Sequence, residues 1–194
     1  MIYYLFGKSA SGKDTIYKHL KELHPDWKEV TPYTTRPIRE GETEGVEYHF
    51  VNAKQMEYFR KSGCLIEERT YQTIYGPWTY GTVDDGQIDL SKPNDYLMIG
   101  VLQSYINIRD YYGKKNVMPL YIEVPDEVRL ERAKQREMLE NTPKFDEMVR
   151  RFNADNVDFS EDKLINAGIT KRYQNIVLED CINEIIKDTG KPNI

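Results

Sequence analysis

The chain has 194 residues, of which 39% are hydrophobic and 30% are charged, a balance that suits one compact soluble domain with a sizeable core. Its formal net charge of -5 and its isoelectric point near 5.4 argue against a general binder of nucleic acid or of acidic membranes, because such proteins carry a basic excess. Cys64 and Cys181 have no metal-ligand spacing and are expected to be free thiols. No apolar run approaches the ~20 residues of a membrane span, so the cytoplasm is the expected compartment.

The first expected element is a buried parallel strand at residues 2–6, which are aromatic or aliphatic without interruption. A loop of sequence GKSASGKDT follows at residues 7–15, called the phosphate loop below. The spacing of Gly7, Gly12 and Lys13 is that of a loop whose backbone N–H groups surround phosphate oxygens at the start of a helix. A hydroxyl that would approach magnesium comes one place late in this pattern, after an aspartate.

The stretch after the phosphate loop is expected to hold short, mixed elements. In chain order they are a core-packing helix at residues 15–23, β-leaning segments at 27–33 and 48–51, a helix between Asn52 as its N-cap and Gly63, a strand at 64–67, and a small antiparallel piece at 70–82. Residues 34–42 (TTRPIREGE) break all periodicity. Such a break between regular elements favours a functional role for that segment.

The second half of the chain alternates apolar runs with helical patterns. The expected elements are strands at residues 96–101, 120–124 and 176–178, and helices that end near Gly113, run from a cap at Asp126 to about 140, run from 145 to about 159 after a turn at 141–143, and cover 181–186. Strand, helix and strand in succession predict a parallel crossover. The expected fold is α/β: a P-loop-type parallel sheet covered by helices, with an inserted β-rich segment and an inserted helical lid.

Several motifs occur in one order along the chain. Residues 7–15 fit G-x-x-x-x-G-K-x-T, and residues 34–42 and 45–51 (GVEYHFV) fit T-T-R-x-P-R-x-G-E and G-x-D-Y-x-F-V, with the proline one place early. Residues 65–67 (LIE) and 80–82 (YGT) correspond to F-x-E and Y-G-[ST]. In these motifs the chain resembles the guanylate kinase family of P-loop nucleoside monophosphate kinases, and the resemblance covers nearly its whole length.

The resemblance implies a reaction and a division of the chain. The reaction is the Mg²⁺-dependent transfer of the γ-phosphoryl group of ATP to GMP, which gives ADP and GDP. A single domain, residues 1–194, would consist of a core (about 1–31, 93–126 and 160–194), a monophosphate-binding segment (about 32–92) and a lid (about 127–159).

On the donor side, the resemblance assigns ATP to the phosphate loop and to residues near the C-terminus. The expected ATP contacts are Gly7, Ser9, Ala10, Ser11, Gly12, Lys13, Asp14, Thr15, Arg136 and Asn175, and the expected catalytic residues are Lys13, Arg36, Arg132 and Arg151. Fixed cations of this kind stabilise the charge of a phosphoryl group in transfer. Mg²⁺ is the expected cofactor, with Thr15 and Asp14 as candidate ligands. The lid arginines also admit a plainer interpretation as surface pairing partners within charged helices.

On the acceptor side, the expected GMP contacts are Arg36, Arg39, Tyr48, Glu67, Tyr80 and Thr82. Guanidinium groups bind a phosphate in bidentate fashion, and tyrosine hydroxyls add neutral donors. A carboxylate at position 67 accepts both N–H groups on one edge of guanine, and a hydroxyl at position 82 donates to the base carbonyl.

The chain departs from the family pattern in two places. Residues 98–101 (MIGV) stand where the family has L-D-I-D, so Ile99 and Val101 replace two carboxylates tied to metal and guanine binding, and Pro32 replaces a serine. The acceptor, the metal ligands, the order of binding and the oligomeric state therefore stay open at this point. One alternative is a kinase of the same fold for another nucleotide or small acceptor. The other is a non-catalytic guanylate-kinase-like binding module, against which the intact phosphate loop argues.

Overall fold

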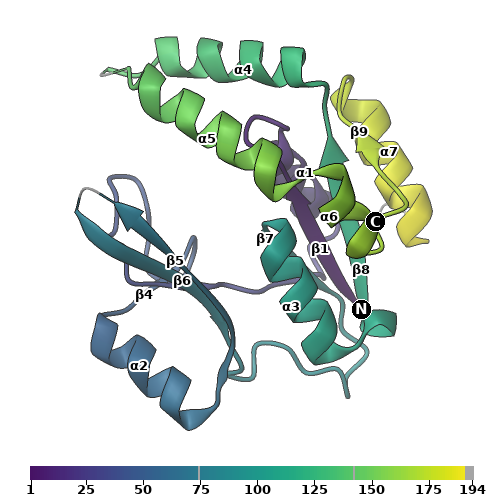
Figure 1. Ribbon diagram of the computed structural model, residues 1–194. Coiled ribbons are helices and arrows are strands. Elements are labelled where there is room, and N and C mark those ends of the chain that lie inside the picture. Colours follow the sequence, from purple (N-terminus) through teal and green to yellow (C-terminus); the bar gives the residue numbers. More distant parts are fainter. Residues whose placement is uncertain (74, 142, 191–194) are drawn as a thin grey trace.

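The computed structural model describes residues 1–73, 75–141 and 143–190. Its centre is a parallel sheet with the strand order β2-β7-β1-β8-β9 (Figure 1). These strands are β1 (Ile2–Gly7), β2 (Lys28–Glu29), β7 (Tyr96–Gly100), β8 (Val117–Glu123) and β9 (Tyr173–Gln174). Every residue of β1 is buried between its two neighbours, which confirms the prediction of a buried parallel strand at residues 2–6.

Helices cover both faces of this sheet. They are α1 (Lys13–Leu23), α3 (Leu102–Tyr112), α6 (Glu161–Asn166) and α7 (Leu178–Thr189), with a 3-10 turn, η1 (Lys114–Asn116), after α3. Alternate side chains of a strand face opposite sides, so Ile2, Tyr4 and Phe6 pack in one core with α3 and α6. Tyr3 and Leu5 pack in a second core with α1 and α7. The predicted α/β fold class is confirmed.

A second, smaller sheet lies to one side of the first, with the strand order β4-β3-β6-β5 (Figure 1). Its strands are β3 (Tyr33–Thr34), β4 (His49–Phe50), β5 (Leu65–Thr73) and β6 (Gly76–Val83). β5 and β6 are antiparallel, as predicted for residues 70–82. The helix α2 (Ala53–Ser62) begins with a capping box between Asn52 and Gln55 and ends at Gly63 in the left-handed conformation, so both of its predicted boundaries are confirmed.

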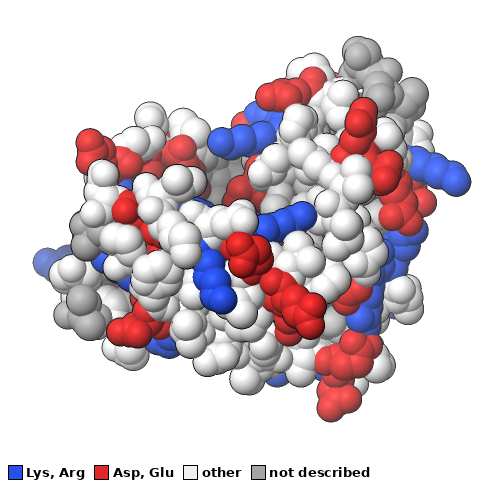
Figure 2. Space-filling view, turned by 90° about the horizontal axis from the view of Figure 1, so that it is seen from above, with Lys and Arg blue, Asp and Glu red and all other residues white. Residues whose placement is uncertain are grey.

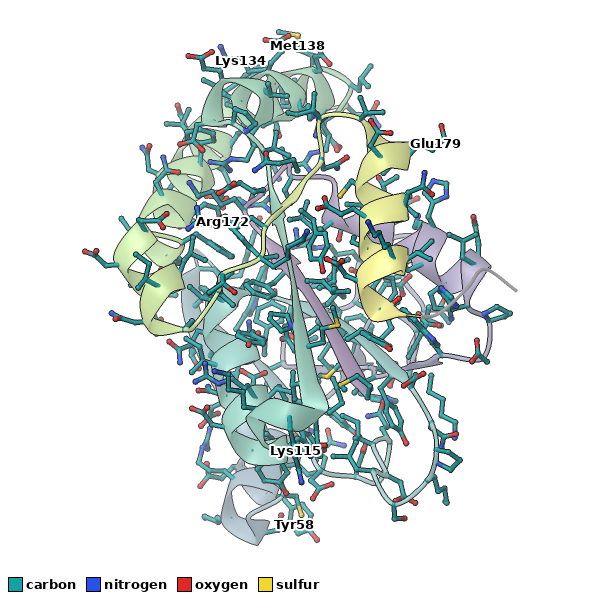
Figure 3. All side chains as sticks on the ribbon, turned by 90° about the vertical axis from the view of Figure 1, so that its right-hand side faces the viewer. Tyr58, Lys115, Lys134, Met138, Arg172 and Glu179 are labelled. Carbon is teal, nitrogen blue, oxygen red and sulfur yellow. The ribbon has the colours of Figure 1, made fainter. Side chains whose placement is uncertain are left out.

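Two antiparallel helices, α4 (Asp126–Met138) and α5 (Phe145–Asp158), extend over the end of the main sheet and are called the helical arm below (Figure 1). Lys134 and Met138 lie at the outer end of the arm, at the opposite end of the molecule from Tyr58 of α2 (Figure 3). Pro125 rather than Asp126 is the N-cap of α4, so the predicted cap is one residue late. Thr142, in the predicted turn of the arm, lies outside the described residues.

The predicted strand at residues 176–178 is wrong. The strand in this region is β9, which pairs with β8 and ends at Gln174, two residues before the predicted strand begins. The helix α7 already begins at Leu178. Ile176 and Val177 are each 53% exposed, so this short apolar run does not belong to the core. A run of three apolar residues has no periodicity that separates a strand from the entry to a helix. Among the described residues, none of the helices is both long and apolar enough to cross a membrane.

Candidate nucleotide-binding site

The phosphate loop connects β1 to α1 and packs tightly against its neighbours. A Cβ atom on Gly7 would lie 2.6 Å from the carbonyl oxygen of Ile122, so only glycine fits there. Gly12 has a φ of 82°, and Ala10 has a φ of 61°, the one positive φ among described non-glycine residues. A left-handed conformation costs alanine ~1 to 2 kcal/mol. Left-handed residues within such a turn direct successive N–H groups into one concave surface, which is the geometry that binds an anion.

Asn175 joins the phosphate loop to the last part of the chain. Its side-chain Nδ2 donates to the carbonyl oxygen of Ser11 at 2.8 Å, and its backbone N–H donates to Glu123 at 3.0 Å. The carbonyl oxygen of Asn175 accepts a hydrogen bond from Nη2 of Arg132 at 3.0 Å. Two residues predicted for the donor side, Asn175 and Arg132, therefore contact each other, and Asn175 also contacts the phosphate loop.

The other predicted donor-side groups are more open. Lys13 and Asp14 begin α1, where the Lys13 ammonium lies 3.8 Å from the Asp14 carboxylate, and Asp14 and Thr15 are exposed. The hydroxyl of Ser11 is buried and has no hydrogen-bond partner among the described residues. Arg136 and Arg151 are exposed on the helical arm, and no hydrogen bond between described residues ties their guanidinium groups to the phosphate loop.

On the second sheet, the side chains of Arg36, Tyr48 and Tyr80 form a group, called the acceptor cluster below. The guanidinium carbon of Arg36 lies 5.4 Å from the ring centre of Tyr48, whose ring meets that of Tyr80 edge to face at 5.6 Å. Arg36 is 3% exposed and makes a bidentate pair with Glu42, from Nη1 at 3.0 Å and Nη2 at 2.8 Å. Burial lowers the pKa of Arg36, but Glu42 raises it and the net shift is upward.

Arg39 differs from Arg36 in its surroundings. Its backbone N–H donates to Oε2 of Glu42 at 2.8 Å, while its guanidinium is exposed and makes no hydrogen bond or ion pair with another described residue. Glu42 thus fixes the backbone at Arg39 and the side chain of Arg36. One predicted phosphate-binding arginine is held in place, and the other remains available to a ligand.

Glu67 and Thr82, the predicted base-binding pair, lie side by side on β5 and β6. The Thr82 hydroxyl donates to Oε1 of Glu67 at 3.0 Å, and the Glu67 side chain has no exposed area. Burial raises the pKa of Glu67, although neighbouring Arg69 and Thr82 oppose this effect. Such a carboxylate is stabilised in its charged form only by close partners.

The sequence and the structure of this chain were compared with known proteins. The model of the guanylate kinase family matches residues 2–189. This chain belongs to the guanylate kinase family. The crystal structure of guanylate kinase from Anaplasma phagocytophilum has a TM-score of 0.68 to this chain at 16% sequence identity, and the match covers 98% of this chain and 84% of that one. At that identity the match shows a shared fold, the α/β fold of P-loop guanylate kinases.

Named guanylate kinases are also similar in sequence. The protein of Frankia casuarinae is 43% identical over 79 residues, which are 40% of each chain. That of Salinibacter ruber is 28% identical over 128 residues, 66% of each chain, and that of Chlorobium luteolum is 23% identical over 180 residues, 92% of this chain and 83% of the relative. In the first of these matches, the chain spans two fifths of the relative's length.

Within the guanylate kinase fold, one residue of the acceptor region was missed by sequence reasoning. Arg69 follows Glu67 on the same face of β5, and its Nη1 donates to the Ser104 hydroxyl at 3.2 Å. It lines a cavity of about 420 Å³, which Val101 also lines. Val101 is one of the apolar departures, so a cation now stands close to where the family has a carboxylate. The signal in the sequence was that residues 67 and 69 are two positions apart in a predicted strand region, which places both side chains on the same face.

The surface carries charged side chains of both signs. On the face drawn in Figure 2, acidic and basic side chains are interspersed, which agrees with the low net charge of the chain. No cluster of three or more histidine, cysteine, aspartate or glutamate residues able to hold a metal ion occurs in the described ranges.

Proposed function

We propose that this chain is a guanylate kinase, which transfers the γ-phosphoryl group of ATP to GMP and gives ADP and GDP. The observation that supports this proposal is the presence of two separate groups of residues, each suited to bind a phosphate. One is the left-handed turn at Ala10 and Gly12 next to Lys13, and the other is the acceptor cluster with Arg39 beside it. Two polyanions can react only where fixed cations and N–H donors hold both of them in line.

The proposed reaction needs no covalent intermediate on the protein. An oxygen of the GMP phosphate forms the new bond to the γ-phosphorus as the bond to the ADP oxygen breaks. The loop N–H groups and Lys13 bind the donor phosphates, and Lys13 stabilises charge that develops during transfer. Arg36, Arg39 and the hydroxyls of Tyr48 and Tyr80 bind the acceptor phosphate.

The remaining donor-side roles rest on position. Ser9, Ala10 and Ser11 line the donor phosphate site with Gly7 and Gly12. Arg132 donates to the carbonyl of Asn175, whose side chain contacts the phosphate loop, and is proposed to act on the transferring phosphate from there. Arg136 and Arg151 extend from the helical arm and contact the nucleotide when the arm closes.

The chain is proposed to act as one unit with three parts. Residues 32–92 would serve as the monophosphate-binding segment, residues 127–159 as the lid, and the rest as the core. The second sheet lies within the first range, and the helical arm, which begins at Asp126 and ends at Asp158, nearly coincides with the second.

Mg²⁺ fits this site as a cofactor held largely by the nucleotide. Such an ion keeps several waters and binds substrate phosphates through one or two protein oxygens. Asp14 and Thr15, exposed at the start of α1, are the proposed protein ligands. The ion would neutralise charge on the transferring phosphates.

For the base, the proposed contacts are Glu67 and Thr82. The Oε2 atom of Glu67 is buried without a hydrogen-bond partner among the described residues, and a guanine N–H would satisfy it. The presence of Arg69 and Val101 near this pair supports a second candidate, a kinase of the same fold for another acceptor.

A coupled assay of ADP release with GMP, dGMP, AMP, UMP and CMP separates these candidates. We expect the highest kcat/KM with GMP. Preference for another monophosphate would favour the second candidate. ATP binding without activity on any of them would overturn the guanylate kinase assignment and would favour a kinase for a different small acceptor or a non-catalytic binding module.

A further inference from the structure

The helical arm contacts the phosphate loop through the backbone of one residue, Ser9. The N–H group of Ser9 donates to Oδ2 of Asp155, on α5, at 2.7 Å. The carbonyl oxygen of Ser9 accepts from Nη1 of Arg129, on α4, at 2.9 Å. Both backbone groups of one loop residue are thus bound by the two helices of the arm, from 146 and 120 positions away in the sequence.

Arg129 is the centre of this contact. It is 1% exposed, and besides Ser9 it donates from Nε and Nη2 to Oδ1 of Asp126 at 3.1 and 2.8 Å. Its guanidinium also lies 3.6 Å from the Asp155 carboxylate and over the ring of Phe152, 4.4 Å from the ring centre. A buried arginine persists only where several partners offset its loss of hydration, and this one has them.

Lys8 adds a second cation to the group. Its ammonium donates to Asp126 at 3.3 Å and to Oδ1 of Asn156 at 2.9 Å. Nη2 of Arg129 donates to the same Asn156 oxygen at 3.2 Å. With Asp126 and Asp155 as the acids, two positive and two negative groups balance, so the contact is a network rather than a single exposed pair.

Ser9 directly precedes Ala10, so this network fixes the backbone next to the left-handed residue of the loop. The carbonyl that Arg129 holds belongs to the peptide bond between Ser9 and Ala10. The plane of that bond determines φ of Ala10, which is 61° and unfavourable for alanine. An unfavourable conformation persists where the surrounding contacts fix it. Ala10 is also the first left-handed residue of the anion-binding turn.

We propose that Arg129 and Asp155 are positioning residues of the donor site. Asp155 holds the Lys8–Ser9 peptide group by its N–H and Arg129 holds the Ser9–Ala10 peptide group by its carbonyl oxygen. This clamp on both sides of Ser9 keeps Ala10 in its left-handed conformation and so preorganises the loop for the phosphates of ATP. This inference rests on the proposed function, because it takes the phosphate loop as the donor site. The clamp also links donor affinity to the base of the helical arm. A contact that only packed the arm against the core would need neither backbone group of the loop.

The test compares Asp155→Ala, Asp155→Asn and the wild type. Asp155 is suited to this because its side chain is 18% exposed and lies at the edge of the network. The asparagine amide oxygen still accepts from the Ser9 N–H, whereas alanine cannot. Asp146→Ala is the matched control, since it removes an exposed carboxylate from the first turn of the same helix. The measurements are Mg·ADP binding by titration calorimetry, KM for ATP and for GMP, and the melting temperature.

For Asp155→Ala we expect about a tenfold weaker affinity for ADP and a similar rise in KM for ATP, which is the usual effect of losing one charge-assisted hydrogen bond. KM for GMP should change less than twofold. Asp155→Asn should recover most of the loss, and Asp146→Ala should match the wild type. Equal affinities for ADP in Asp155→Ala and the wild type would overturn the clamp alone.

A second variant tests the other half of the clamp. Arg129→Lys retains a buried cation but cannot bridge Ser9, Asp126 and Asn156 together, so it should weaken ADP binding as Asp155→Ala does. If it lowers the melting temperature while folded protein still binds ADP with wild-type affinity, Arg129 only packs the arm and the proposal fails. Absence of ADP binding in the wild type would overturn the donor site itself, and with it the proposed function.

Discussion

The Nε atom of Arg69 lies 3.0 Å from Oε2 of Glu67 in the acceptor region. The Glu67 side chain has no exposed area and that of Arg69 is 18% exposed. These two atoms are nevertheless without a well-aligned hydrogen bond among the described residues. A donor and an acceptor therefore lie side by side with unused capacity, within an ion pair that neutralises the buried carboxylate. Removing either partner leaves the other charge buried, which is costly.

Glu67→Gln is expected to reduce kcat/KM for GMP 10- to 100-fold, while activity on AMP stays level or rises. A pocket that accepts a substrate N–H through a charged, buried group loses more than a neutral pair would when that group is replaced. Steady-state kinetics with both monophosphates measure the ratio. Glu68→Gln is the control, because Glu68 pairs with Arg60 and is only partly buried. An unchanged GMP to AMP ratio would remove Glu67 from base recognition.

Lys13→Ala is expected to leave the fold intact and nearly abolish turnover. In the structure the ammonium of Lys13 has one ion-pair contact among described residues, at 3.8 Å from Asp14, so little native stability depends on it. A group that acts on charge in the transition state typically contributes ~3 to 4 kcal/mol, or ~10² to 10³ in kcat. Lys18→Ala, an exposed lysine on the same helix, should retain full activity. A folded Lys13→Ala protein with most of its activity would contradict the proposed role.

The two arginines of the acceptor side are expected to respond differently. Arg39→Ala should weaken GMP binding about tenfold or more at unchanged ATP affinity and melting temperature, because its guanidinium has no partner in the described structure. Arg36→Ala should also destabilise the fold by ~1.5 to 3 kcal/mol, since it removes the bidentate pair with Glu42. Calorimetry with each nucleotide and thermal melts measure both effects. Equal losses for ATP and GMP in Arg39→Ala would place that residue elsewhere.

Local patterns in the sequence predicted the phosphate loop and the small sheet well. The run at residues 2–6 and the glycines at 7 and 12 specify a strand and a tight turn without help from distant residues. Asn52 and Gly63 likewise encode a helix cap and a helix end. Thr82 and Glu67 were paired by motif, and the β5–β6 register brings them together. Each of these features depends on residues close in sequence or on one hairpin.

Contacts across the fold were not predictable in the same way. Arg129 looks like any charged residue of an arginine-rich helix, and only folding brings it to Ser9, 120 positions away. Asp155 is one of many acids on the helical arm, and nothing near it marks it as a partner of the phosphate loop. The prediction of a strand at residues 176–178 is wrong because the exposure of these apolar residues depends on where β9 and α7 meet. Burial of a charge is a property of the tertiary structure rather than of the local sequence.

The two cysteines are expected to differ in reactivity. Burial, followed by the charge of Glu184, raises the pKa of Cys181 to about 12, and this thiol is 1% exposed. Cys64 is only partly buried beside β5. A thiolate is the reactive form, so titration with a thiol-specific disulfide reagent at pH 8 should modify Cys64 alone in the native protein and both thiols in denaturant. Cys64→Ser should abolish the native reaction. Modification of Cys181 in that folded variant would contradict its burial.

Glu42→Gln is expected to remove a pH-dependent contribution to stability. The hydrogen bonds from Arg36 are the largest cause that lowers the pKa of Glu42 below its usual 4.5, with the Arg39 backbone N–H acting in the same direction against burial. The unfolded chain therefore binds a proton to this carboxylate more readily than the folded chain does. The stabilisation is fully present above the unfolded pKa and is lost as pH falls through the folded value.

At pH 6 the wild type should exceed Glu42→Gln by ~2 kcal/mol in its free energy of unfolding. Urea unfolding at a series of pH values should show this difference shrinking below pH 4.5, while Glu40→Gln, an exposed neighbour, should follow the wild type throughout. A difference independent of pH would mean that the charge of Glu42 does not stabilise the acceptor cluster.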